Sequence, residues 1–84
     1  MTDDQATLAQ LQADARAERR AEAAQIIRRI RRNEAATRAL GLHSTAAQYH
    51  RDARALAHAY RTREDRLAAR DRFTLHLLAH PHHA

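Results

Sequence analysis

Residues 44–79 read STAAQYHRDARALAHAYRTREDRLAARDRFTLHLLA, a stretch without glycine or proline. Apolar side chains recur in it at steps of four, three, four and seven residues: Tyr49, Ala53, Leu56, Tyr60 and Leu67. These steps place side chains on one stripe of an α-helix, which turns once every 3.6 residues. An apolar stripe is not stable alone in water, so we expect this helix to pack on another one.

The same rhythm extends the stripe in both directions. It includes Ala46 before the central five and then four later positions, which are Arg63, Arg70, Thr74 and Leu77. A buried arginine without a partner is costly. The two arginines therefore predict that acidic side chains face them from the opposing helix.

The first forty residues predict that opposing helix. Thr2 and Gln5 have the spacing of a capping box, and Asp3 and Asp4 lie where the helix dipole favours acids. Gly41 is the only glycine, and it stands where a left-handed residue ends a helix. We therefore expect one domain, 1–84, that begins with a helix over 3–40.

The second helix has its own predicted limits. Ser44 or Thr45 is the expected N-cap, and Pro81 stops the helix near Ala79. This reading gives a turn over 41–43, a helix over 44–79 and a flexible tail over 80–84. A connection this short makes the helices neighbours in an antiparallel hairpin.

The apolar stripe of the first helix is weaker. Its positions are Leu8, Leu11 and Ala15, then Glu18 and Glu22, then Ile26, Ile30, Thr37 and Leu40. In a hairpin that turns at Leu42, residues whose numbers add to about 84 face each other. This register predicts that Glu22 pairs with an arginine in the range Arg61 to Arg63 and that Asp14 pairs with Arg70.

The core material is thin for a chain of this length. Leu, Ile, Val and Phe together make 13 of 84 residues, and alanine supplies most of the remaining apolar count. Without cysteine there is no disulfide to compensate. The predicted fold class is therefore all-α, an antiparallel hairpin of two long helices that dimerises into a four-helix arrangement. The predicted interface residues are Ile26, Ile30, Tyr49, Ala53, Leu56, Tyr60 and Leu67.

Arginine supplies all fifteen basic residues, and the formal net charge is +5. Around Ile26, Ile27 and Ile30 the first helix divides sharply into an apolar arc and a basic remainder. Clustered arginines neutralise phosphates and release counterions. The candidate nucleic-acid-binding residues are Arg28, Arg29, Arg31, Arg32, Arg51 and Arg54. A GC-rich genome enriches arginine and alanine as well, so composition alone leaves this reading open.

Residues 34–51 resemble bacterial helix-turn-helix DNA-binding segments. A short helix is followed by the turn Leu40-Gly41-Leu42 and by a helix with a polar start. The resemblance covers about eighteen residues and implies a recognition helix in the major groove. The residues facing the groove would be Ser44, Thr45, Gln48, Tyr49 and Asp52.

Other chemistry finds little support in the sequence. His76 and His80 lie one helical turn apart, with His82 and His83 beyond Pro81, but no carboxylate or thiol nearby completes a metal site. There is no glycine-rich phosphate loop, and no nucleophile stands beside a matched base. We therefore expect no enzyme activity, no cofactor and no metal site.

Two hypotheses about function remain. In the first, the protein binds DNA or RNA through its arginine-rich helix faces as a regulator or architectural factor. In the second, it is a helical adaptor or structural subunit whose partner is a protein within a larger assembly. Both are compatible with a homo-oligomer. An acidic, polar start and the lack of a long apolar run predict a cytoplasmic protein with no membrane contact.

Overall fold

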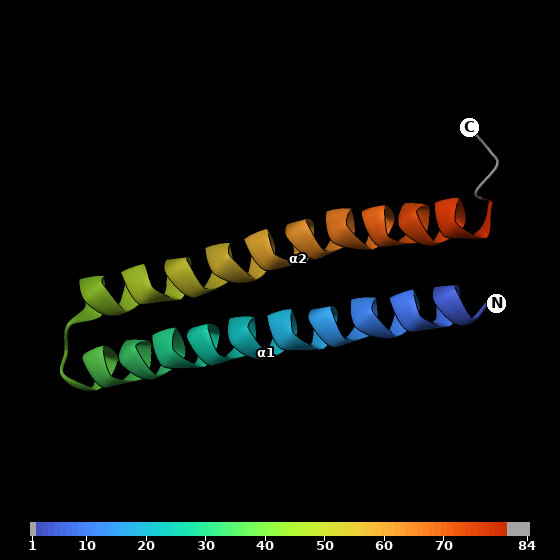
Figure 1. The fold of residues 1–84 in the computed structure, drawn as a ribbon. Coiled ribbons are helices and arrows are strands. Elements are labelled where there is room, and N and C mark those ends of the chain that lie inside the picture. Colours follow the sequence, from blue (N-terminus) through green and yellow to red (C-terminus); the bar gives the residue numbers. More distant parts are fainter. Residues whose placement is uncertain (1, 81–84) are drawn as a thin grey trace.

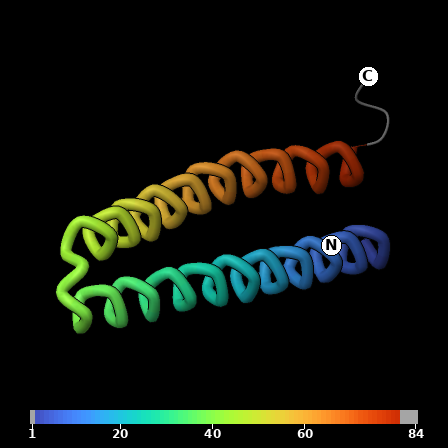
Figure 2. Tube along the Cα trace, turned by 90° about the vertical axis from the view of Figure 1, so that its left-hand side faces the viewer, coloured from blue at the N-terminus to red at the C-terminus, as the bar shows by residue number. Residues whose placement is uncertain are grey.

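A computed structural model describes residues 2–80 as two long helices, α1 (Asp3–Ala39) and α2 (His43–Ala79). They run side by side in opposite directions, as the two views in Figure 1 and Figure 2 agree. The molecule is a thin slab of 63 × 20 × 11 Å. The described part contains no strand, and the predicted all-α hairpin is confirmed.

The start of α1 is the predicted capping box. The Gln5 N–H donates to Thr2 Oγ1 at 3.1 Å, and the Thr2 N–H donates to Gln5 Oε1 at 2.9 Å. Asp3 and Asp4 lie in the first turn, where the helix dipole stabilises negative charge. The sequence therefore specifies this helix end locally.

Gly41 ends α1 in a left-handed conformation, with φ of 78°. Its N–H donates to the Arg38 carbonyl at 3.0 Å, and the Leu42 N–H donates to the Thr37 carbonyl at 2.9 Å. These two bonds form a Schellman motif, which satisfies carbonyls that the helix end leaves open. The predicted glycine turn is confirmed.

The predicted cap of α2 is wrong. The helix begins at His43, Leu42 occupies the N-cap position, and no side chain caps it. The Leu42 carbonyl already accepts from the Ala46 N–H at 2.9 Å. Because the Schellman closure brings Leu42 directly to the start of α2, Ser44 and Thr45 fall inside the first turn. At the other end α2 stops at Ala79, as expected, and the predicted tail beyond His80 lies outside the described residues.

The two helices meet along a narrow seam. Ala46 and Ala53 are fully buried in it, and their small side chains let the backbones approach closely. The half-buried residues that continue the seam along α2 are His50, Ala57, Tyr60, Glu64, Leu67, Asp71 and Leu75. Since only alanines are fully buried among the apolar side chains of the described chain, the hairpin alone has a small core.

The predicted stripe drifts away from this seam after Tyr60. Arg63 and Arg70 are exposed, and Glu64 and Asp71 face α1 instead. Between Tyr60 and Leu67, which are seven residues apart, helical periodicity allows either residue 63 or residue 64 to face α1. In the structure it is Glu64 that faces α1. The expectation that the seam arginines of α2 meet acids of α1 is therefore wrong.

The predicted register is nevertheless correct. Arg19 faces Glu64, Gln12 faces Asp71 and Glu34 faces His50, pairs whose residue numbers add to about 84. The charges are reversed at the open end of the hairpin, because α1 supplies the arginines and α2 the carboxylates. Glu22 and Arg63 line the same pocket without an ion pair in the described chain. Asp14 accepts a hydrogen bond from Gln10 instead of pairing with Arg70.

Residues 34–51 do not adopt a helix-turn-helix arrangement. In that motif two short helices cross at a large angle, whereas α1 and α2 are each 37 residues long and antiparallel. Tyr49 is half-buried, and Gln48 and Asp52 bond to each other on the surface of α2. The resemblance is confined to the order of residues around the turn.

Candidate interaction surfaces

The slab has two broad faces, one on each side of the seam. Helical periodicity assigns each side chain to one of them, because residues three or four positions apart lie on the same side. The grooves confirm the division, since one groove is lined by Leu8 and Thr74 and the opposite one by Ala9 and Arg72. We name the two sides the apolar face and the basic face.

The apolar face carries most of the large apolar side chains: Leu8, Leu11, Ile26, Tyr49, Leu56, Tyr60, Leu67 and Leu78. Leu11 is 60 % exposed and Ile26 is 46 % exposed. Each half-buried member touches the seam with one edge and solvent with the other. The apolar arc of each helix is therefore wider than the contact between the two helices.

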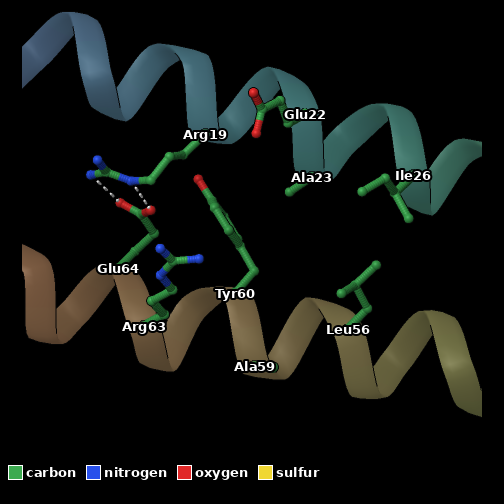
Figure 3. A pocket seen from close by; sticks show the side chains of 9 residues that line it. All are labelled: Arg19, Glu22, Ala23, Ile26, Leu56, Ala59, Tyr60, Arg63 and Glu64. Atoms are coloured by element: carbon green, nitrogen blue, oxygen red, sulfur yellow. Dashed lines mark hydrogen bonds and ion pairs between the residues drawn. The ribbon is translucent and has the colours of Figure 1, made fainter.

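A pocket of about 250 Å³ opens on this face at mid-height. In Figure 3, Ile26 of α1 and Leu56 of α2 point toward each other across it, and Tyr60 reaches from α2 toward α1. Glu22 and Arg63 lie at its rim. The pocket thus has an apolar floor, and two acids and two bases line its edges.

A two-bond ion pair closes one end of this pocket. Arg19 donates from Nε to Glu64 Oε1 and from Nη2 to Glu64 Oε2, the latter at 3.1 Å (Figure 3). The hydrogen bonds from Arg19 hold the pKa of Glu64 below its ordinary value, although partial burial opposes the shift. The same contact raises the pKa of Arg19. This geometry is the strong, fork-like form of an arginine–carboxylate contact.

Closer to the open end, α2 contacts two further polar residues of α1. Arg16 Nη1 lies 3.5 Å from Asp71 Oδ2. Gln12 Nε2 donates to the Asp71 carbonyl at 3.2 Å. Together with Arg19, these residues fix the register where large buried side chains are lacking.

Glu34 is the one buried carboxylate in the described chain, with 7 % exposed. Arg31 Nη1 lies 3.2 Å from Oε1, Arg38 Nη1 lies 2.9 Å from Oε2, and His50 Nδ1 lies 3.3 Å from Oε2. Burial alone raises the pKa of Glu34, but the hydrogen bonds from Arg38 and Arg31 outweigh it and the pKa is lowered. The sequence analysis missed this cluster, although the spacing of Arg31, Glu34 and Arg38 is visible in the sequence.

Four of the six predicted nucleic-acid-binding residues share the basic face. Arg31 and Arg54 flank the seam on that side, and Arg28 and Arg51 lie farther out on the same two helices. The register brings all four to one level of the hairpin. They form a band across the 20 Å width of the slab, which we name the arginine band.

The other two predicted residues lie elsewhere on α1. Arg29 and Arg32 project from its outer side, where they line a shallow pocket with Gln25 and Arg28. In the arginine band, Arg28, Arg51 and Arg54 have no carboxylate three or four positions away on their own helix. Only Arg31 is neutralised by a neighbouring acid, Glu34.

The predicted interface residues divide in a similar way. Ala53 is fully buried, and five others are half-buried beside the seam: Ile30, Tyr49, Leu56, Tyr60 and Leu67. Ile26 is exposed on the apolar face. The predicted set therefore describes the apolar face and its edge more closely than the seam itself.

Two histidines, His76 and His80, lie at the C-terminal end of α2. The rings of His76 and His80 are 4.5 Å apart between centroids. Within residues 2–80, no three histidine or acidic side chains are grouped to hold a metal ion, while His82 and His83 lie outside that range. Neither α1 nor α2 is apolar enough over a sufficient length to cross a membrane.

No protein-family model, curated protein or solved structure matches the chain.

Proposed function

We propose that the protein is a non-enzymatic nucleic-acid-binding protein that uses its basic face as a regulator or architectural factor. The observation that supports this proposal is the arginine band, formed by Arg28, Arg31, Arg51 and Arg54. Three of these four side chains have no carboxylate three or four positions away on their own helix. Arginine carries a permanent charge, and its planar fork fits phosphate oxygens.

The band also has a suitable layout for a phosphate backbone. Its members come from two helices that the seam holds in fixed register, so the charges are spaced before a ligand arrives. A protein that neutralises several phosphates releases their counterions, and its affinity falls steeply with salt. Contacts of this kind provide position and affinity and leave base sequence unread.

Fluorescence anisotropy of a labelled random duplex, titrated at several salt concentrations, tests the proposal. We expect binding at low salt, with a steep slope of log affinity against log salt. Arg54→Gln removes one phosphate contact and lowers the magnitude of that slope by about 1. Arg66→Gln is the matched control, because Arg66 is exposed on the outer side of α2 and lies away from the band.

Two results contradict the proposal. One is the absence of binding even at low salt. The other is an equal effect of Arg54→Gln and Arg66→Gln, which would show that total charge rather than the band determines the affinity.

A second candidate is a helical adaptor or structural subunit that binds protein. The exposed apolar side chains favour it, since Leu11 and Ile26 are about half exposed on the apolar face. Contiguous exposed apolar surface is typical of protein contact sites. Binding to a protein partner that does not weaken with salt, and that is unchanged when Arg28 and Arg54 are replaced, separates this candidate from the first.

We also propose that the hairpin self-associates into a four-helix arrangement. The fully buried apolar side chains of the described chain are two alanines, and small domains with so little core need additional burial. Self-association through the apolar face supplies it. This leaves both basic faces on the outside, so it is compatible with the nucleic-acid proposal.

A further inference from the structure

We propose that a second copy of this chain covers the apolar face, with the two turns at the same end. In this dimer a two-fold axis runs along the hairpin, so each α1 lies over the α2 of the partner subunit. The inference rests on the proposed self-association. It adds which face the second copy covers, how the two hairpins are oriented and which ion pairs join them.

Continuity with the seam supports this choice of face. Leu56, Tyr60 and Leu67 contact the seam with one edge and remain half open on the other. In a four-helix bundle each helix contacts two neighbours, so its apolar arc must be wider than in a single helix pair. The arcs of α1 and α2 have this width, whereas Leu75, which lines the groove of the basic face, lies beside the seam.

The charges at the rim of the apolar face support an occupant with the same sequence. Glu22 lies on the α1 rim and Arg63 on the α2 rim, and both line the pocket of Figure 3. Within the described hairpin neither forms an ion pair with any residue. At this level of the hairpin the α1 rim therefore offers an acid and the α2 rim a base, and neither is in an ion pair with another described residue.

The orientation follows from the register. Glu22 and Arg63 lie at one level, since their numbers add to about 84. A two-fold axis along the hairpin preserves that level and exchanges the α1 side with the α2 side. Glu22 then lies over Arg63 of the partner subunit, and the same pair forms a second time by symmetry.

The opposite orientation brings like charges together. A two-fold axis across the hairpin lays α1 antiparallel on the partner's copy of α1. Glu18 and Glu22 lie near the middle of Asp3–Ala39, so each pair of acids would face its own copy.

Spin-label distances test the orientation directly. The chain has no cysteine, so Ser44→Cys creates a single labelling site at the exposed start of α2. With both turns at one end, double electron–electron resonance gives a distance well below half of the 63 Å length. A distance close to that full length overturns the proposed orientation.

Charge exchange tests the ion pair. Glu22→Arg and Arg63→Glu each raise the dissociation constant of the dimer about tenfold, because each places like charges at the rim. The double variant, Glu22→Arg with Arg63→Glu, restores the affinity. Asp14→Arg is the control for Glu22→Arg, since it makes the same charge change on the outer side of α1 and leaves the dimer unchanged.

The outcomes separate the two levels of the proposal. A wild-type chain that stays monomeric at every concentration overturns self-association and with it the inference. A dimer with a long spin-label distance, or without rescue in the double variant, overturns the same-end arrangement and leaves self-association standing.

Discussion

The two broad faces of the hairpin are built from the same two helices and the same register, yet they differ in chemistry. On the apolar face, Ile26 and Leu56 approach across an open pocket. At almost the same level of the basic face, Arg28 and Arg54 extend into solvent. The seam between them consists of two fully buried alanines, half-buried side chains such as Tyr60, and ion pairs. The contact between the two long helices is therefore small, and the hairpin as a whole keeps one apolar and one basic face.

This difference shows that an amphipathic helix can have more apolar surface than one neighbour covers. The centre of an apolar stripe in the sequence then lies between the side that packs on the neighbouring helix and the apolar side that remains open. In α2 the predicted stripe runs through Tyr49, Leu56 and Arg63, between the seam with α1 and the open face. The proposed second copy on the apolar face would account for the offset of the predicted stripe from the observed seam.

The largest expected effect on the melting temperature comes from replacing apolar side chains of the apolar face with polar ones. The double variant Ile26→Gln/Leu56→Gln lowers the melting temperature by about 10 °C, because it removes about 2 kcal/mol of apolar burial. The matched variant Arg28→Gln/Arg54→Gln, at the same level of the other face, leaves it almost unchanged. Circular dichroism melts at one protein concentration measure both. Equal losses in the two variants would show that the faces do not differ in burial.

The next effect on the melting temperature is smaller, and it compares an acid in the seam, Glu64, with an acid outside it, Glu22. Glu64→Arg lowers the melting temperature by about 5 °C at every concentration, since it turns the contact with Arg19 into repulsion. Glu22→Arg lowers it only where the dimer forms, because Glu22 lies at the rim of the apolar face. Melts across a dilution series distinguish the two. A Glu22→Arg loss that persists at the lowest concentration would place Glu22 in the intrachain contact.

The smallest expected effect is a loss of stability in acid. The pKa of Glu34 and the pKa of Glu64 are both lowered in the folded chain, so their contribution is present above the unfolded glutamate value of about 4.3. It is lost as the pH falls through the folded values. The melting temperature should therefore hold from neutral pH to about pH 5 and then fall.

The variant Glu34→Gln isolates one part of this acid response. It starts from a lower melting temperature at neutral pH, and its difference from the wild type shrinks as the pH drops below about 4. Glu18→Gln, an exposed change on α1, is the control and keeps the wild-type profile. A Glu34→Gln difference that is constant with pH would contradict a role for the charged carboxylate.

Local signals in the sequence were sufficient to predict the two ends of α1, the turn and the antiparallel register. Thr2 with Gln5 and the single Gly41 specify helix ends through short hydrogen bonds that depend on neighbouring residues alone. The register followed from the position of the turn. The start of α2 was misplaced because Ser44 and Thr45 are good caps in isolation, whereas the closure around Gly41 had already placed Leu42 there.

The tertiary contacts depended on information that one stripe does not contain. The step from Tyr60 to Leu67 allowed Arg63 or Glu64 between them, and only packing against α1 selects Glu64. The same ambiguity reversed the predicted ion pairs. For the candidate nucleic-acid surface, the sequence identified the arginines, but their division between the basic face and the outer side of α1 required the orientation of the seam.

Sedimentation equilibrium across a dilution series tests the central claim, that the apolar face is buried between two copies while the basic face stays outside. For the wild type we predict a species of twice the 9.6 kDa chain mass that dissociates on dilution. For Ile26→Gln/Leu56→Gln we predict the single-chain mass throughout, and for Arg28→Gln/Arg54→Gln the wild-type behaviour. A wild-type protein that remains at the single-chain mass at every concentration would contradict the account.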